Sequence, residues 1–265
     1  MAVQQVGCAR SRDAAKAGRA PGRRLAALAA ATALGGGVWL AAAPMASAAT
    51  SHCLIINNAI DTSYTSLQAA VTAAASGATL WVRGTCTGTA TISTSLTITG
   101  QQPAGFTAPT LSGGGPGPVL DIEINPLAVP GVTLNNLTVT GGNAPSGFEG
   151  GGIFDIGHLT LNNVAVSGNT AVLGGGIGVE DEGVIGGIVT LNNSTVAGNT
   201  AFGLGGGIFI AGGSPASPAP VVTLNDSTVT GNTAGASGGG VLNDGSLILN
   251  GTSSVTGNTP DDISS

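Results

Sequence analysis

Residues 160–177 read Thr-Leu-Asn-Asn-Val-Ala-Val-Ser-Gly-Asn-Thr-Ala-Val-Leu-Gly-Gly-Gly-Ile, and two further copies of this phrase follow in the chain. The second copy opens at Leu191 and the third at Leu224, and each continues with Gly-Asn-Thr and a Gly triplet. A repeat of this kind is typical of a solenoid, in which each unit buries its apolar face only against its neighbours. The repeat therefore predicts the architecture before any local pattern is considered.

The spacing of the repeats indicates which solenoid to expect. The Leu that opens each copy lies at positions 134, 161, 191, 224 and 249, in steps of 27, 30, 33 and 25 residues. Two insertions lengthen the steps, an acidic one at 179–187 and one rich in Pro, Ser and Ala at 211–220. Without them the period is roughly 25 residues, enough for three short strands and three turns. This favours a parallel β-helix over a leucine-rich repeat or a propeller, whose blades need about 40 residues.

One Asn recurs at a similar place in every coil of this predicted helix. The positions are Asn143, Asn169, Asn199, Asn232 and Asn258. In a parallel, in-register stack, equivalent residues lie about 4.8 Å apart, and an amide carries both a donor and an acceptor. We therefore predict that these Asn form a ladder with a structural role.

The first 48 residues differ from the rest. They contain six of the seven basic residues, an apolar run at 25–43 and the small-residue pattern Ala46-Ser47-Ala48, which is typical of a secretory signal peptide. The apolar run of about 19 residues leaves a membrane anchor as the alternative, and Arg23-Arg24 leaves twin-arginine export open beside the general route. We expect a signal peptide at 1–48, an amino-terminal segment at 49–78 and a β-helix at 79–265. The protein would be secreted or held at the cell surface, without a membrane span after cleavage.

Loss of the leader would make the chain strongly acidic. One basic residue, Arg83, and twelve acidic residues remain after position 48, a formal net charge of −11. Nucleic-acid binding requires clustered Lys and Arg, so we expect no nucleic-acid partner. The chain is 42% hydrophobic and 8% charged, a composition that argues against disorder.

The segment before the repeats predicts a cap for the first coil. Leu67, Ala70, Val71 and Ala74 recur at helical spacing within 64–75, Thr65-Ser66-Leu67-Gln68 matches a capping box, and Gly77 suits the end of the helix. Cys53 and Cys86 flank this segment, and an even pair in an exported chain predicts a disulfide. Two buried free thiols are the alternative. The disulfide would close a loop of about 34 residues and contribute about 3–4 kcal/mol.

The opening Ser66-Leu67-Gln68-Ala69-Ala70-Val71, followed by a strand-like segment at 79–86, resembles exported bacterial proteins of the pectin-lyase-like superfamily. The Gly-Gly-Gly-Ile and Gly-Asn-Thr-Ala runs also resemble the repeats of chlamydial polymorphic outer-membrane proteins. The first resemblance covers about residues 53 to 263 and implies an all-β, single-stranded, right-handed parallel β-helix. It implies no single activity, because such repeats form the scaffold of both lyases and adhesins.

The catalytic patterns of the superfamily are incomplete here. A pectate-lyase-type elimination needs calcium, several carboxylates and a cationic base, and Arg83 is far in sequence from any acidic cluster. A polygalacturonase-type hydrolysis needs convergent Asp, a Gly-His-Gly and an Arg-x-Lys, whereas Gly157-His158-Leu159 lacks the second Gly and Arg-x-Lys is absent. We therefore assign no catalytic residue and expect His158 to be a surface residue.

Two weaker groups of candidate residues remain. Carboxylates of neighbouring loops could hold Ca²⁺, and the candidates are Glu149, Asp155, Glu180, Asp181 and Glu182. A solvated acidic loop is the alternative, and no other cofactor is expected. The aromatic side chains near the Gly triplets could contact a sugar or a protein, or pack against the coil. They are Phe148, Phe154, Phe202 and Phe209, and we expect Phe154 and Phe209 to face outward.

The sequence thus favours an exported, non-catalytic β-helix that recognises carbohydrate or a cell-surface protein. A polysaccharide lyase or glycoside hydrolase acting on a uronate-type polysaccharide is the alternative, and a structural surface component is the second one. Pro260, Asp261 and Asp262 would blunt the open last coil, through which the protein could otherwise self-associate.

Overall fold

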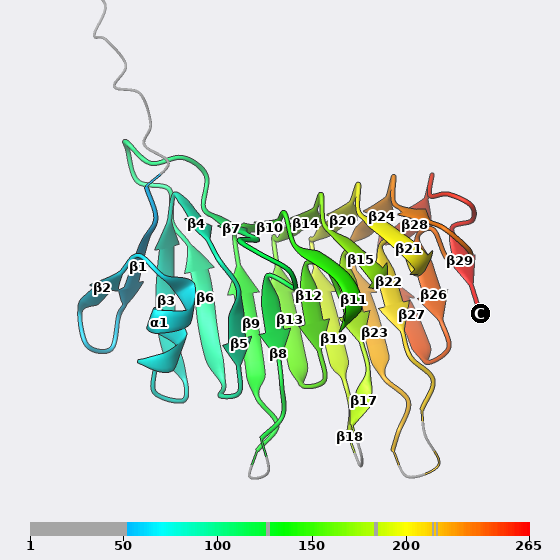
Figure 1. The fold of residues 1–265 in the computed structure, drawn as a ribbon, viewed down its shortest axis with the longest axis horizontal. Coiled ribbons are helices and arrows are strands. Elements are labelled where there is room, and N and C mark those ends of the chain that lie inside the picture. The colour runs from blue at the N-terminus through cyan, green and yellow to red at the C-terminus, as the bar shows by residue number, and fades with distance from the viewer. Residues whose placement is uncertain (1–51, 126–127, 183–184, 214, 216) are drawn as a thin grey trace, which may run out of the picture. The chain divides into compact units, whose positions relative to one another are not determined.

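The computed structural model describes residues 52–125, 128–182, 185–213, 215 and 217–265. These residues are mostly strands, stacked coil upon coil into a parallel β-helix (Figure 1). The predicted signal peptide at 1–48 lies outside the described residues. Within them, no helix has both the length and the apolar character needed to cross a membrane.

Each complete coil visits up to four sheets, which we name A to D in the order in which a four-sheet coil such as β9–β12, residues 131–155, passes through them. Sheet A has the order β2-β1-β3-β6-β9-β13-β19-β23-β27. Its strands are β1 Leu54–Asn57, β2 Thr62–Tyr64, β3 Ala78–Arg83, β6 Leu96–Gly100, β9 Gly131–Asn135, β13 His158–Asn162, β19 Ile188–Asn192, β23 Val221–Asn225 and β27 Ser246–Asn250. Sheet B consists of β4 Thr85–Thr87, β7 Thr110–Ser112, β10 Thr138–Thr140, β14 Ala165–Ser167, β20 Thr195–Ala197, β24 Thr228–Thr230 and β28 Ser254–Thr256.

Sheet C has four strands, whereas sheet D has seven, as sheet B does. Sheet C consists of β11 Asn143–Glu149, β15 Thr170–Leu173, β21 Thr200–Leu204 and β25 Thr233–Ala234. Sheet D consists of β5 Ala90–Ile92, β8 Leu120–Ile122, β12 Ile153–Asp155, β16 Ile177–Val179, β22 Ile208–Ile210, β26 Val241–Asn243 and β29 Ile263–Ser264. A separate antiparallel hairpin, β17 Asp181–Glu182 and β18 Ile185–Gly186, occupies the acidic insertion.

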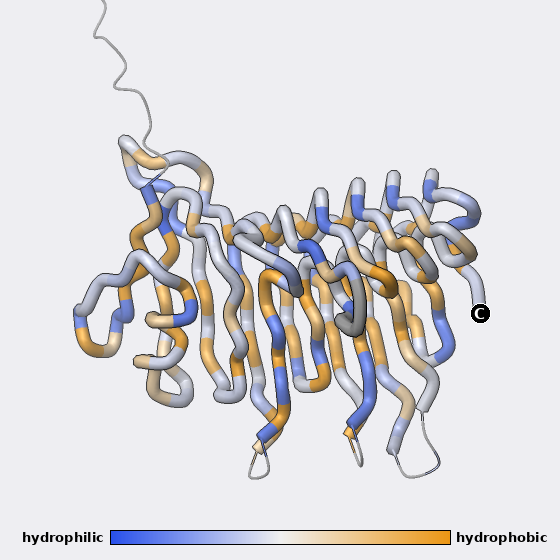
Figure 2. The backbone as a smooth tube through the Cα atoms, viewed as in Figure 1, coloured by the Kyte–Doolittle hydropathy of each residue, from blue (hydrophilic) through white to orange (hydrophobic). Residues whose placement is uncertain are grey.

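The core follows from alternation within strands and from register between them. In sheet A, Leu134, Leu161, Leu191, Leu224 and Leu249 are direct partners from coil to coil. Identical side chains therefore stack inside a narrow interior, and their neighbours along each strand face outward. Figure 2 shows the resulting hydrophobic positions recurring along successive strands.

The amino end is covered, as predicted, but the cap differs in detail. The helix α1 is shorter than the pattern predicts, Leu67–Thr72, and buries Leu67, Ala70 and Val71. Its N-cap is Ser66, whose side chain accepts from the amide of Ala69, and Gln68 bonds instead to the amide of Thr91 on β5. The expected capping box is therefore wrong, because Gln68 is used to fasten the helix to the first coil. Antiparallel strands β1 and β2 extend sheet A, and a disulfide joins Cys53 to Cys86.

The Asn ladder is present in four of the five predicted positions. Hydrogen bonds of 2.9–3.0 Å link the amides of Asn169, Asn199, Asn232 and Asn258 in series inside the coils. Asn143 does not belong to the ladder: it pairs with Thr170 in sheet C, and the ladder position in its coil is Gly142, whose amide donates to Asn169.

A second Asn ladder, which we did not predict from the sequence, lies on the outer side of sheet A. It joins Asn135, Asn162, Asn192, Asn225 and Asn250 through bonds of 2.8–2.9 Å.

Candidate functional site

The outward face of sheet D carries most of the chemically distinctive side chains of the solenoid. The central residue of each three-residue strand faces out, and the register places Asp121 of β8, Phe154 of β12 and Gly178 of β16 side by side. The row continues with Phe209 of β22 and Leu242 of β26. Where the other sheets repeat Thr and Asn, this face combines carboxylates with aromatic and aliphatic groups.

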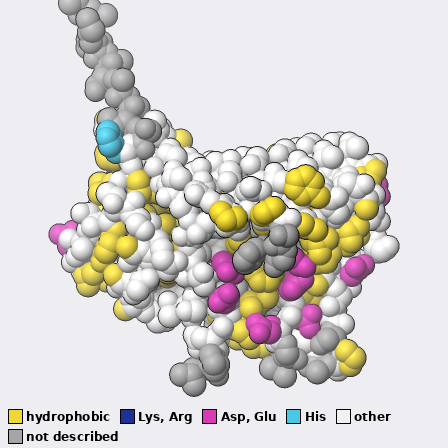
Figure 3. Space-filling model, in the orientation of Figure 1, with side chains coloured by type: hydrophobic (Ala, Val, Ile, Leu, Met, Phe, Trp, Pro, Cys, Tyr) yellow, Lys and Arg dark blue, Asp and Glu magenta, His cyan; other side chains and the backbone are white. Residues whose placement is uncertain are grey.

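The acidic insertion builds one wall of a groove on this face. The chain leaves β16 at Glu180 and folds back as the hairpin β17–β18 before it enters β19. The groove has a volume of about 350 Å³. Its lining is Glu123, Ile124, Phe154, Ile156, Glu180, Asp181 and Glu182. In Figure 3, acidic side chains border a hydrophobic patch on this face of the molecule.

Burial and neighbouring carboxyls raise the pKa of two acidic residues next to the groove. Burial, and secondly the Glu180 carboxyl beside it, raises the pKa of Glu149 to about 8. Burial also raises the pKa of Asp121 to about 6, and the neighbouring Glu123 carboxylate acts in the same direction. One oxygen of each carboxyl, Asp121 Oδ1 and Glu149 Oε2, is buried without a hydrogen-bond partner. Near neutral pH the Glu149 carboxyl is therefore mostly protonated and uncharged, whereas Asp121 is mostly ionised.

Asp155 lies on the wrong side of its strand for the predicted calcium site. It is in register with Ile122 and Val179, which face the core, and its side chain is 0% exposed. Its Oδ1 accepts from the amide of Gly157 at 3.2 Å, whereas Oδ2 has no hydrogen-bond partner. Burial raises the pKa of Asp155 to about 8, although the Gly157 amide acts in the opposite direction.

The five carboxylates predicted as a calcium site therefore do not converge. Strand alternation turns Asp155 inward, while Glu180, Asp181 and Glu182 line the groove outside. Within the part of the chain that the structure describes, no group of three or more His, Cys, Asp or Glu side chains is placed to hold a metal ion.

The basic and imidazole groups are not part of the groove. Arg83 of β3 donates from Nε and Nη2 to the Oε1 of Gln101 at 3.1 and 2.8 Å. His158 is exposed at the start of β13, in register with Gly131 and Ile188 of sheet A. Neither residue lines the acidic groove, so a cation and the groove carboxylates do not form one catalytic arrangement.

The four candidate Phe have different environments. Phe154 is half-buried in the floor of the groove, and Phe202 of β21 is 65% exposed. Phe209 lies in the outward row but is only 8% exposed. The register agrees with the outward direction predicted for Phe209, but its low exposure matches the alternative of a covered ring. Phe148 belongs to β11, and its side chain falls outside the described part.

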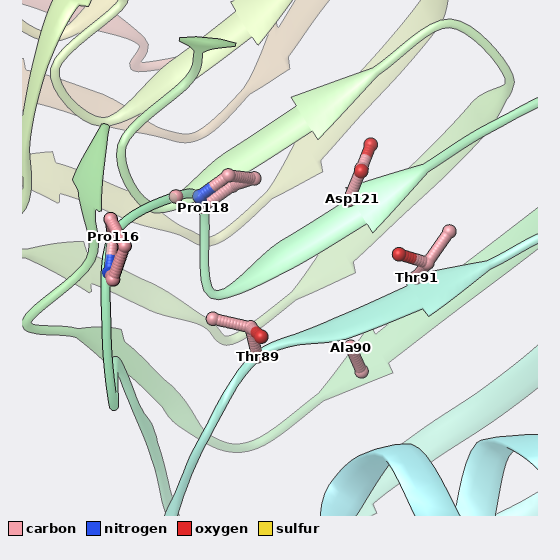
Figure 4. Close-up of a pocket in the computed structure, with 7 residues that line it drawn as sticks. Thr89, Ala90, Thr91, Pro116, Pro118 and Asp121 are labelled. Carbon is pink, nitrogen blue, oxygen red and sulfur yellow. The ribbon is translucent and has the colours of Figure 1, made fainter. Parts of the chain in front are cut away.

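Two smaller hollows lie near the amino-terminal end of sheet D, at strands β5 and β8. One, of about 190 Å³, is lined by Thr89, Thr91, Pro116, Pro118 and Asp121 among others (Figure 4). Asp121 and Thr91 project there from the adjacent strands β8 and β5. The other, of about 250 Å³, lies between α1 and the first coil and has an uncharged lining that includes Gln68, Thr72 and Thr94.

The acidic side of the groove at Glu123 was not predicted, although the sequence contains a pattern that indicates it. Asp121 and Glu123 are separated by one residue in an alternating run, Val119-Leu120-Asp121-Ile122-Glu123-Ile124, which places both on one face of a strand. What the run does not indicate is that this face adjoins the hairpin two coils further on.

No protein-family model, curated protein or solved structure matches the chain. The assignment of a parallel β-helix therefore rests on the strand pairing of this chain, and its function must be argued from the chemistry of the sheet D face.

Proposed function

We propose that this chain is an exported, non-catalytic β-helix of the pectin-lyase-like type that recognises a partner at the cell surface or outside the cell. The observation that carries the proposal is the groove on sheet D, built where an insertion interrupts an otherwise regular repeat. In a solenoid, regular positions maintain the stack, and insertions on one face are where binding surfaces are formed.

The composition of the groove supports binding rather than catalysis. Elimination from a uronate polymer would need a cationic base beside metal-holding carboxylates, but the only basic residue after position 48, Arg83, is engaged with Gln101. Hydrolysis of a glycoside needs two carboxyls separated by about 5–9 Å around the scissile bond. Glu149 and Glu180 instead lie side by side, close enough for the Glu180 carboxyl to help raise the pKa of Glu149, so this pair does not flank a scissile bond.

The proposal is tested with the purified exported chain on immobilised glycans, cell-wall preparations and whole cells. We expect saturable binding that Phe154→Ala weakens at least fivefold, because this ring forms the floor of the groove. Phe202→Ala is the matched control: it removes the same ring from an exposed position that does not line the groove and should leave binding unchanged. The absence of binding to every preparation would favour a structural surface component.

A parallel assay addresses the lyase alternative. The chain is incubated with uronate polymers and calcium while the ultraviolet absorbance of an unsaturated product is followed. We expect no increase in absorbance. An increase that Arg83→Ala abolishes would replace recognition by catalysis as the function.

A further inference from the structure

We propose that the groove on sheet D receives a cationic protein segment, an extended stretch that presents Lys or Arg beside apolar side chains. This inference rests on the recognition function proposed above and names the class of partner. Three features of the groove support it: the negative charge, the apolar floor and the spacing of the carboxylates.

The charge of the groove is unbalanced within the chain. Four of its seven lining residues are acidic and none is basic. Asp121 adds a further carboxylate beside the groove, whereas Glu149, whose pKa is raised to about 8, adds little charge near neutral pH. After residue 48 the chain contains no Lys and only one Arg, which does not line the groove, so the groove carboxylates are left free to pair with a cationic partner. Polyanions such as uronate polymers or nucleic acids would be repelled by this face.

The floor of the groove suits the stem of a long cationic side chain. Phe154 is half-buried, and Ile124 and Ile156 complete the apolar lining. Lys and Arg lay their methylene groups on apolar surfaces while the charged head reaches outward, and a cation above an aromatic face gains about 0.5–2 kcal/mol. Carboxylates at the rim of an apolar floor match such a side chain better than they match a neutral sugar.

The spacing of the carboxylates suits an extended segment. Glu123 continues strand β8 and Glu180 continues β16, two coils further along sheet D. Neighbouring strands lie about 4.8 Å apart, so the two positions are separated by roughly 10 Å. In an extended or polyproline II segment, side chains two or three residues apart lie about 7–9 Å from each other. A basic residue at every second or third position of a partner would therefore meet both ends of the groove.

The probe for the test is a fluorescently labelled nonapeptide of three Lys-Val-Pro repeats, and its matched control replaces each Lys by Glu. Anisotropy is measured with the purified exported chain at low and high salt. We expect the Lys peptide to bind and the Glu peptide not to bind. Raising the salt should weaken the Lys peptide at least tenfold, because exposed charge pairs are screened.

Two double variants separate the groove from the overall negative charge. Glu123→Gln with Glu180→Gln should weaken the Lys peptide about tenfold, as expected for two exposed or half-buried ion pairs of about 0.7 kcal/mol each. Asp61→Asn with Asp226→Asn removes the same charge away from the groove. Both of these positions have positive φ, which Asn tolerates. This control should change the affinity less than twofold.

Equal losses in the two double variants would overturn the inference, because binding would then reflect net charge alone. Equal binding of the Lys and Glu peptides would overturn it as well, in favour of a purely apolar groove. If the chain binds cells or glycans through Phe154 but binds no Lys peptide, this inference fails while the recognition function stands. If it binds neither, both fail.

Discussion

At the scale of single residues, one amide side chain links three coils. Asn199 accepts through Oδ1 from the amide and the Nδ2 of Asn169, and its own Nδ2 donates to the carbonyl of Val166 and to Oδ1 of Asn232. A buried polar group costs free energy unless it is hydrogen-bonded. Asn satisfies this condition inside a stack because it carries both a donor and an acceptor.

Asn199→Ala should therefore destabilise the protein by about 2–4 kcal/mol, since it leaves the buried backbone amide of Asn169 without an acceptor and removes one of the three acceptors of its Nδ2. Asn192→Ala is the matched control in the half-buried outer ladder, where water can replace the lost partner, and should cost about 1 kcal/mol. Urea unfolding followed by circular dichroism measures both losses. Equal losses would contradict the distinction between the two ladders.

The buried Asp155 should make the free energy of unfolding depend on pH in an unusual way. Its pKa is raised to about 8 by burial, whereas an unfolded Asp titrates near 4. The native state therefore retains a proton that the unfolded state has lost between these pH values. The contribution of Asp155 to stability is fully present below about pH 4 and falls by roughly 1.4 kcal/mol per pH unit until about pH 8.

Asp155→Asn should remove this contribution, because the amide retains an acceptor for Gly157 and cannot ionise. The free energy of unfolding of the variant should then decline less steeply from pH 5 to pH 8 than that of the wild-type protein. Parallel urea titrations at the two pH values give the comparison, in which Glu149 and Asp121 act equally on both proteins. Identical slopes would show that Asp155 does not control the pH dependence.

At the scale of elements, the bends between the sheets determine the shape of the coil. Asn136, Asn163, Asn193 and Asp226 turn the chain from sheet A to sheet B with positive φ, which Asn and Asp adopt more readily than other side chains. The Gly triplets turn it from sheet C to sheet D. There, a Cβ on Gly175 would lie 2.5 Å from the carbonyl oxygens of both Gly206 and Thr200.

Gly175→Ala should consequently prevent the close stacking of two coils and destabilise the protein by more than about 3 kcal/mol, or abolish soluble expression. Gly115→Ala is the control, because a Cβ there meets no atom within 4 Å and the backbone does not have positive φ. The midpoint temperatures of thermal unfolding of the two variants give the comparison. Tolerance of Ala at position 175 would show that the bend can open.

Element boundaries were less predictable than the elements themselves. The alternating run at 90–98 suggests one strand, but the chain bends inside it and forms β5 and β6 in two different sheets. Alternation continues through a sharp corner, because both strands bury every second residue against the same narrow core. The length of α1 was overestimated for a related reason: Ala74 packs against the core without belonging to the helix.

At the scale of the whole molecule, the two ends of the solenoid differ. The hairpin of β1 and β2, together with α1, covers the first coil. At the other end, Leu249 is 44% exposed, although its partner Leu224 is fully buried. The last residues close only part of this end. Asp262 accepts from the amide and Nδ2 of Asn258, and β29 pairs with β26.

Removal of Pro260–Ser265 should therefore increase self-association, since it opens the end of the Asn ladder and of sheet D beside an exposed Leu249. Sedimentation velocity should show a larger species that grows with protein concentration. Leu249→Thr in the truncated chain should reverse part of the effect, because it removes the apolar contact and keeps a residue suited to strands. An unchanged sedimentation coefficient after truncation would contradict this role of the tail.

The period, the in-register stack and four members of the inner Asn ladder could be predicted from the sequence alone. Stacking demands the same residue at the same place in every coil, so the information is visible as a repeat. The side chains that form the groove could not be predicted, because they come from different coils and are brought together by the stacking. Glu123 and Glu180 line the same groove because only strand β12 lies between β8 and β16 in sheet D. The direction of Asp155, and the replacement of Asn143 by Gly142 in the ladder, depend on where a bend ends, and a shift of one residue exchanges the inner and outer faces of a strand.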